Sequence, residues 1–214
     1  MKLVDIDGKK LRPAGITELN IIRNTVPKDA RQYIVLDKSG YIDKNHLKLY
    51  QGNSQNYNNI KEIVEDEITI EVLLDDKFSF IDKNGQLGTA IMQYYPHDPL
   101  YPEDKDINCN LVNGLSTGET GFSGKTLFPD RVGMQNSPSD NIVIIINKHL
   151  SPAGAAEIYS HEANGHGLLY IRNGGDHLGA SHNIINQDGK LIETNEVLKN
   201  MIRQSRLETI SNMR

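Results

Sequence analysis

The chain is poor in the residues that build disulfide-rich folds or cysteine-based metal sites. Among its 214 residues there is one cysteine, Cys109, and no tryptophan. A single cysteine excludes an internal disulfide framework and a cysteine-rich zinc knuckle. Cys109 is therefore interpreted as a buried or incidental thiol. The cysteine content does not fix the redox compartment.

Positive charge and long apolar runs are also scarce. Lys and Arg number 23 against 28 Asp and Glu, which gives a formal net charge of −5. A mildly acidic chain lacks the electrostatic footprint of a nucleic-acid-binding protein. The longest apolar run, residues 142–146, is far too short to cross a bilayer. We therefore expect no nucleic-acid partner and no membrane span.

The opening residues lack the apolar core of a secretory signal peptide. Charged side chains stand there instead, at Lys2, Asp5, Asp7, Lys9 and Lys10. We expect no export signal in this chain, so any export would take place as part of a larger polypeptide. The sequence leaves localisation and oligomeric state open.

Apolar periodicity and turn residues predict several elements in the first 94 residues. They are a helix within residues 14–27, a strand at 32–37, a helix capped by Asn59 that includes Ile60 and Val64, and a hairpin formed by residues 68–74 and 78–81. Residues 94–106 then carry three prolines in thirteen positions. This stretch predicts a boundary between an N-terminal α+β module, residues 1–105, and a second region, residues 106–214, unless the two form one continuous domain.

The second region contains a strand followed by a helix. After glycine-rich loops over 113–141, residues 141–147 form a strand of the buried type, and Ser151 and Pro152 are typical of a helix start. The pattern predicts a helix that reaches about Arg172 and ends at residues 173–175. A last helix is expected from about Glu193 to Ser211.

The predicted helix carries the sequence His161–Glu162–Ala163–Asn164–Gly165–His166. Catalytic zinc sites use histidine or carboxylate ligands and keep one position open for water. A glutamate beside that water can act as the general base. Two histidines and a glutamate on one helix supply these groups, so we expect His161 and His166 to bind Zn2+ and Glu162 to accept the proton.

The spacing of this motif is one residue longer than in HExxH. On an ideal α-helix, residues five apart lie about 140° apart around the axis, too far to share a metal. A one-residue π-bulge would correct this, and Gly165 would lower its cost. Two alternatives remain: Glu162 and His166 bind a metal without His161, or the histidines are surface residues of an ordinary helix.

The third ligand has three candidates. Glu193 is favoured, because the expected last helix would place it on the same inward stripe as Val197 and Met201. His182 and His177 compete, since a histidine soon after the glycine turn could fold back over the metal. Four of the 7 histidines lie between residues 161 and 182.

Other candidate groups are weaker. Tyr170 and Arg203 could stabilise a developing oxyanion, although Tyr170 could equally be a core residue. Residues 118–126 end in Gly-Lys-Thr like a P-loop, but Glu119 stands where the first glycine is needed. We therefore reject nucleotide binding.

The six residues 161–166 resemble the lengthened zinc motif HExxGH of the dipeptidyl-peptidase III family. The resemblance implies two histidine ligands, a glutamate base and a glutamate ligand from a later helix. The second motif of that family, EExxAE, is not matched by residues 191–196, LIETNE. The resemblance therefore does not identify the third ligand, and it implies no dipeptidase activity.

A broader resemblance covers about the last 100 residues. The strand at 141–147, the HExxGHG stretch and the closing helix look like zincin-type domains at the C-termini of bacterial Rhs-repeat polymorphic toxins. Residues 3–10, LVDIDGKK, are similar to the DxDG-type sequence that ends the Rhs shell. The resemblance implies a toxin payload whose partner would be an immunity protein.

These observations predict an α+β protein with a zincin-like C-terminal half. The expected function is that of a zinc metallopeptidase acting on a peptide or protein, with the substrate aligned by an edge strand near Ile144. A non-catalytic binding or structural domain and a metal-dependent hydrolase of a non-peptide substrate are the alternatives.

Overall fold

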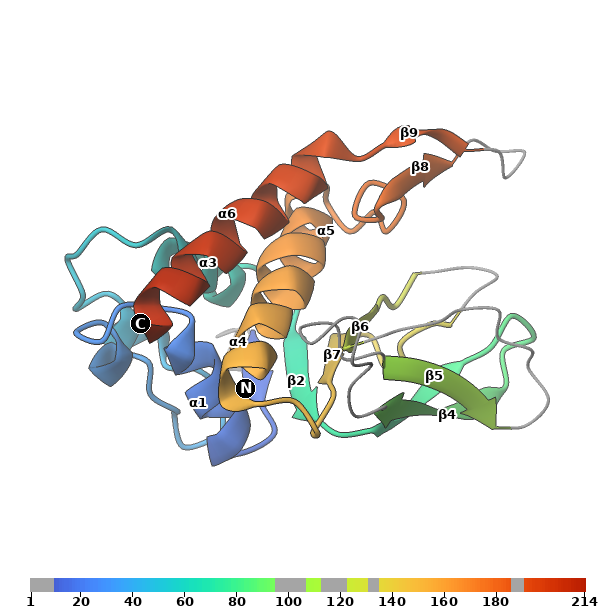
Figure 1. The fold of residues 1–214 in the computed structure, drawn as a ribbon, viewed down its shortest axis with the longest axis horizontal. Helices are drawn as coiled ribbons and strands as arrows, with labels where there is room; N and C mark the ends of the chain where they lie inside the picture. The colour runs from blue at the N-terminus through green and yellow to red at the C-terminus, as the bar shows by residue number, and fades with distance from the viewer. Residues whose placement is uncertain (1–9, 95–106, 113–122, 131–134, 186–190) are drawn as a thin grey trace, which may run out of the picture.

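The computed structural model describes residues 10–94, 107–112, 123–130, 135–185 and 191–214 (Figure 1). The fold is mixed α+β. The helices are α1 (Ile16–Asn24), the 3-10 turn η1 (Arg31–Tyr33), α2 (Lys44–Leu47), α3 (Gln55–Glu65), α4 (Pro152–His161), the π-helical segment η2 (Glu162–Gly167), α5 (Leu168–Arg172) and α6 (Glu196–Met213). The strands are β1 (Leu11–Pro13), β2 (Ile70–Leu74), β3 (Lys77–Ile81), β4 (Leu87–Tyr94), β5 (Ile107–Val112), β6 (Gly124–Leu127), β7 (Ile142–Ile146), β8 (Asn183–Ile185) and β9 (Leu191–Thr194).

The main sheet has the strand order β1-β2-β7-β6. Strands β1, β2 and β7 are parallel, and β6 runs antiparallel to β7. Strand β7, the predicted strand at 141–147, is confirmed, but it lies inside the sheet between β2 and β6. The expectation that the strand near Ile144 is an edge strand is therefore wrong. In the described part of the chain, β6 is the last strand on that side.

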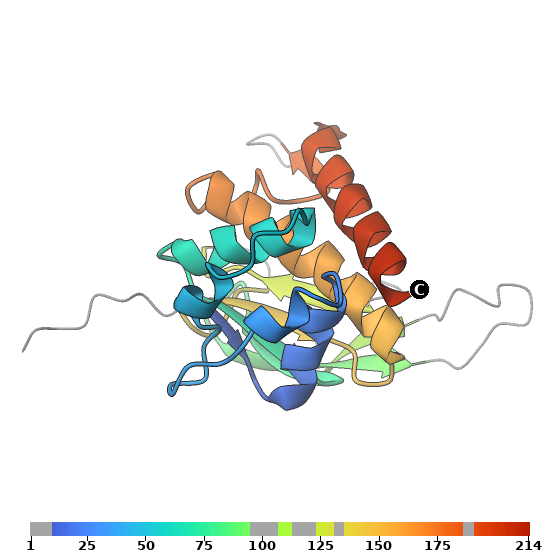
Figure 2. The same ribbon diagram turned by 90° about the vertical axis from the view of Figure 1, so that its left-hand side faces the viewer.

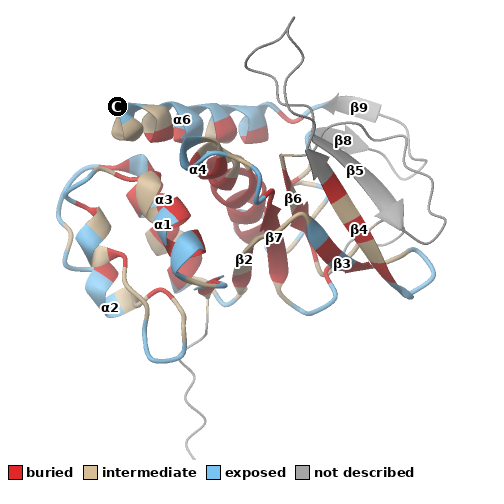
Figure 3. Cartoon of the chain, turned by 60° about the horizontal axis from the view of Figure 1, so that its bottom comes forward, coloured by how far each residue is buried: buried red, intermediate tan, exposed pale blue. Residues whose placement is uncertain are grey.

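Strand β7 is buried on both faces (Figure 3), which explains why all of its residues are apolar. Ile142, Ile144 and Ile146 belong to the larger core, under the helices. Val143 and Ile145 pack in a second core with Phe80 of the β3-β4-β5 sheet. The molecule therefore has a helical layer, a central sheet and a smaller sheet on the side of the central sheet away from the helices (Figures 1 and 2).

The helical layer is centred on one continuous rod, α4–η2–α5, which crosses the central sheet beneath α6 (Figure 1). Ser151 caps its start by accepting a hydrogen bond from the backbone N–H of Gly154, and Pro152 follows as predicted. Gly174 and Gly175 end the rod with φ of 69° and 88°, values that glycine adopts without strain. These boundaries confirm the predicted helix and its stop.

The N-terminal predictions are confirmed only in part. Helix α1 lies within residues 14–27 as expected, and α3 includes Ile60 and Val64, but its cap is Ser54 rather than Asn59. The predicted strand at 32–37 is wrong: residues 31–33 form a 3-10 turn, followed only by an isolated bridge between Leu36 and Ile42.

The predicted hairpin of residues 68–74 and 78–81 is also wrong. Strand β2 pairs with β1 and β7, whereas β3 pairs with β4 in the other sheet. The turn at Asp75 and Asp76 therefore connects the two sheets and does not close a β-hairpin.

The expected boundary lies largely outside the described residues, which omit 95–106. Strand β2 precedes this stretch and pairs with β7, which follows it, so the segments 1–105 and 106–214 contribute to one sheet. Residues 124–127, expected to lie in a loop, form β6 instead. Cys109 lies in β5.

No helix in the described part of the chain is long and apolar enough to cross a membrane.

Candidate metal centre

The π-helical segment η2 occupies the middle of the long rod, between His161 and Leu168. Each π-turn contains more residues than an α-turn, so it rotates the following residues back around the axis. The rings of His161 and His166 consequently lie with centroids 5.2 Å apart. The π-bulge predicted from the HExxxH spacing is confirmed.

A third imidazole, that of His182, completes the cluster. Its Nε2 atom lies 3.2 Å from His161 Nε2 and 3.2 Å from His166 Nε2. The ligand atoms of all three residues lie within 4.8 Å of one another. His182 follows His161 by 21 residues and His166 by 16 residues, yet all three direct Nε2 toward one position.

The other nitrogen of His166 has a partner. His166 is buried, and its Nδ1 lies 2.6 Å from the backbone oxygen of Ala180. Because a carbonyl only accepts, Nδ1 carries the proton and donates it, and Nε2 keeps a lone pair directed at the cluster. Metal-binding histidines commonly have such a partner, which fixes both tautomer and ring orientation.

The spacing of these nitrogens suits a tetrahedral cation. With Zn–N bonds of about 2.0–2.1 Å, two tetrahedral nitrogen ligands lie roughly 3.3 Å apart. The two contacts of 3.2 Å agree with that value. Three imidazoles and no thiolate also form a donor set that zinc accepts. His161, His166 and His182 therefore fit the predicted metal.

Two of the three imidazoles, those of His161 and His182, have lowered pKa values. The pKa of His161 is lowered to about 4, mainly by burial; Glu162 opposes this shift, and His166, His182 and Arg206 add to it. The pKa of His182 is also lowered by burial and by His166, again opposed by Glu162. At neutral pH both rings are neutral and can bind a metal.

Glu162 lies beside the cluster and is buried. Its Oε2 accepts a hydrogen bond of 2.6 Å from the hydroxyl of Thr126 in β6. In the described part of the chain its Oε1 makes no hydrogen bond, so this oxygen can accept a proton. Gly124 allows β6 to pack this close to the helical rod, since a Cβ there would lie 2.3 Å from Ile158 Cγ2 and 3.1 Å from Glu162 Cγ.

Gly165 contributes through packing rather than through an unusual backbone. Its φ is not positive, but a Cβ at this position would lie 2.5 Å from Cγ1 of Ile202 in α6. Asn164 donates from Nδ2 to the hydroxyl of Ser205, 2.9 Å away, and Ser205 donates to Asn56 Oδ1 at 2.6 Å. Close packing and a buried polar network thus hold η2 against α6 and α3.

The loop that carries His182 is attached to the start of α6 by Asn195. The Asn195 side chain caps α6 by accepting from Leu198 N–H, and its Nδ2 donates to the backbone oxygens of Gly179 and Ser181. The backbone N–H of Asn195 donates to the His182 oxygen, 2.8 Å away. One asparagine therefore fixes both the helix start and the third imidazole.

Glu193 does not occupy the element on which its prediction depended. The last helix begins at Glu196, and Glu193 lies in β9, paired with Ile184. The inward stripe was also misplaced, because Val197 is 61% exposed whereas Leu198 and Ile202 are buried. The side chain of Glu193 lies outside the described residues, so its role as a ligand stays a prediction.

The other candidate site residues, His177, Tyr170 and Arg203, lie in different surroundings. His177 contacts Asp130, with its Nδ1 2.9 Å from a carboxylate oxygen, instead of the histidine cluster. Tyr170 is buried and stacks on Phe128 with ring centroids 4.8 Å apart, which identifies it as a core residue. Arg203 lines the same pocket as His161 and His182. The triplet Gly-Lys-Thr of the rejected P-loop lies in β6.

The sequence did not reveal the roles of Thr126 and Asn195. Asparagine is a preferred N-cap, so Asn195 could have been identified as the start of the last helix. Thr126 offered no local signal, since its contact with Glu162 depends on how β6 pairs with β7.

Comparisons with family models, with curated proteins and with solved structures found no match for this chain.

Proposed function

We propose that this chain is a zinc-dependent hydrolase of the zincin type, and that its substrate is a peptide or protein. The observation that carries the proposal is the convergence of three Nε2 atoms beside a buried glutamate, at a π-turn within one helix. Structural zinc sites generally use four protein ligands, whereas catalytic sites use three and leave one position open. Three imidazoles next to a pocket favour the catalytic type.

His161, His166 and His182 would hold the zinc, which supplies Lewis-acid polarisation of a carbonyl and acidifies bound water. Glu162 accepts the proton of the attacking water at Oε1 and returns it to the leaving amine. Thr126 holds the other carboxylate oxygen, so that the orientation of Oε1 does not depend on substrate. The buried surroundings of Glu162 exclude bulk water from this transfer.

The resemblance to Rhs-associated toxin domains fits this assignment, and we propose an effector role with an immunity protein as its partner. A non-catalytic domain would not need a buried carboxylate beside the imidazoles, oriented by a hydroxyl from another strand. A hydrolase of a non-peptide substrate would use the same groups, so only substrate screening separates it from a peptidase.

The test is the pair Glu162→Gln and His182→Ala, each assayed for zinc content and for digestion of a broad peptide library. We expect Glu162→Gln to keep stoichiometric zinc and lose at least about 100-fold of its activity. His182→Ala should lose both. His46→Ala, at an exposed histidine, is the matched control. A wild-type protein that binds no zinc, or an active Glu162→Gln variant, would contradict the proposal.

A further inference from the structure

A pocket of about 380 Å³ lies beside the histidine cluster and extends along α6. His161 and His182 line one part of it, and the rest includes Thr194, Asn195 and the side chains of α6 that face them. Its volume lies within the range of about 300–1,000 Å³ that is common for ligand sites. A molecule bound at the metal centre would therefore occupy this space as well.

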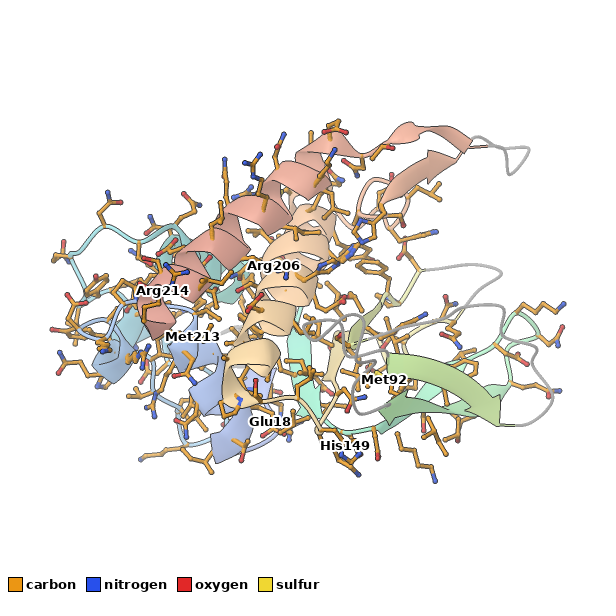
Figure 4. The ribbon with its side chains drawn as sticks, in the orientation of Figure 1. Glu18, Met92, His149, Arg206, Met213 and Arg214 are labelled. Atoms are coloured by element: carbon orange, nitrogen blue, oxygen red, sulfur yellow. The ribbon has the colours of Figure 1, made fainter. Side chains whose placement is uncertain are left out.

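The pocket is positively charged although the whole protein carries a net charge of −5. The pocket is lined by Lys199, Arg203 and Arg206, and none of the described lining residues is acidic. Arg203 and Arg206 follow Lys199 by four and seven residues on α6. Such spacing places the three cations on one side of α6. Figure 4 shows Arg206 on α6, the helix that lies over α4.

The three cations differ in how far they are neutralised. Lys199 contacts Glu196 at 3.1 Å, and Arg206 contacts Glu157 at 3.0 Å. Arg203 is exposed and forms no ion pair with the residues that the structure describes. Its guanidinium is therefore available to a ligand, and guanidinium binds a carboxylate with two parallel hydrogen bonds.

Apolar side chains complete the lining. Ile202, Leu207 and Ile210 of α6 line the pocket beside the cations, and Leu207 is 57% exposed. Large exposed apolar side chains beside a charged group favour a ligand that has both an apolar part and a charged group. A phosphate alone, or a nucleic-acid backbone, would leave these side chains uncovered.

We propose that this pocket, lined by Lys199, Arg203 and Arg206, binds a carboxylate group of the substrate next to the metal centre, on a segment with apolar side chains. The carboxylate belongs either to the C-terminus of a peptide or to an acidic side chain near the cleaved bond. The inference rests on the proposed function for its choice of a peptide, and it adds a preference for acidic substrates.

The experiment uses the zinc-loaded Glu162→Gln protein, immobilised, so that bound peptides are not consumed. Pooled random pentapeptides are applied in two forms, with a free C-terminal carboxylate and with a C-terminal amide, and each form contains either Glu or Gln at one position. Retained peptides are quantified by mass spectrometry. The same pools are applied after the further change Arg203→Gln, and after Lys38→Gln, which removes one positive charge at an exposed lysine elsewhere.

We expect peptides with a carboxylate to be enriched, and Arg203→Gln but not Lys38→Gln to reduce that enrichment about tenfold. Enrichment of free C-termini over amides assigns the group to the α-carboxylate, and enrichment of Glu over Gln assigns it to a side chain. Retention without regard to carboxylates, or enrichment unchanged by Arg203→Gln, would overturn the inference.

Cleavage by the wild-type protein is measured in parallel with the same pools. Carboxylate-dependent retention without any cleavage would uphold this pocket and contradict the proposed peptidase. Cleavage without carboxylate preference would uphold the peptidase and contradict the pocket.

Discussion

The structure brings together two groups of possible metal ligands, and they differ in charge and in how their members contact one another. One is His161, His166 and His182, and the other is Asp130, Asp176 and His177. In the first, three nitrogens face each other without a counter-charge between them. In the second, His177 already forms a 2.9 Å contact with the Asp130 carboxylate, and both acids are exposed.

Proximity of ligand-type atoms alone therefore does not make the two groups equal candidates for a metal site. Three imidazole lone pairs directed at one position repel each other unless a cation lies between them, whereas an imidazole and a carboxylate satisfy each other through a proton. The first group is also held in place by Ala180, whose backbone oxygen accepts from His166 Nδ1, and by Asn195, which donates to the backbone oxygen of Ser181.

The largest effect is expected when each group loses one histidine. His182→Ala removes a ligand and should reduce zinc affinity at least about 100-fold, because two imidazoles do not complete a site. His177→Ala should leave zinc affinity within about twofold. Competition with a chromogenic chelator measures both variants. Equal losses in the two variants would show that the second group also binds the metal.

The next effect concerns the packing that maintains the π-turn. Gly165→Ala would force the added methyl against Ile202, and overpacking of this kind costs about 1–3 kcal/mol. Gly154→Ala, at the start of the same rod, meets only ordinary contacts of 3.4 Å or more and is the matched control. Urea denaturation of the two variants tests this. If Gly165→Ala is as stable as Gly154→Ala, the close approach of η2 to α6 is not as described.

These features also show which parts of the site follow from sequence. The strand at 142–146, the Ser151 cap and the glycine stop are local signals, and all were predicted correctly. The π-turn followed from the hypothesis that His161 and His166 share one metal, because residues five apart cannot face one position on a regular α-helix. The centre of the site was therefore accessible from the sequence.

The failures have a common physical cause. Strands β2 and β3 look like a hairpin, but β2 pairs in parallel with β7, whose sequence position is about 70 residues away, and no local pattern reveals such pairing. The backbone of Ile34, in the wrongly predicted strand, is satisfied by the Arg23 side chain at 2.8 Å. Glu193 was placed on a helix because the Asn195 cap was overlooked.

A smaller effect is expected from the contact between β6 and the base. Thr126→Val removes the hydroxyl that holds Glu162, and we expect the activity to fall about tenfold with zinc content unchanged. Thr126→Ser keeps the hydroxyl and should restore the activity. Loss of zinc in Thr126→Val would mean that Thr126 supports the fold instead.

The mildest perturbation is a change of pH in the metal-free protein. The pKa of His161 is about 4 in the folded chain against 6.5 for a free imidazole. Between these values the unfolded chain binds the proton and the folded chain does not, so stability falls as pH decreases from about 6.5 to about 4. Urea denaturation across this range should show that slope, and His161→Asn should reduce it. Stability that increases toward pH 4 in the wild type would contradict the depressed pKa.

The most direct test is X-ray absorption at the zinc edge of the loaded protein. The proposed function predicts three imidazole nitrogens about 2.0–2.1 Å from one zinc ion, with one position left for water, and the loss of one imidazole in His182→Ala. Zinc that binds with fewer than three imidazoles in the wild type, or an unchanged spectrum in His182→Ala, would contradict the convergence of His161, His166 and His182 on a single metal.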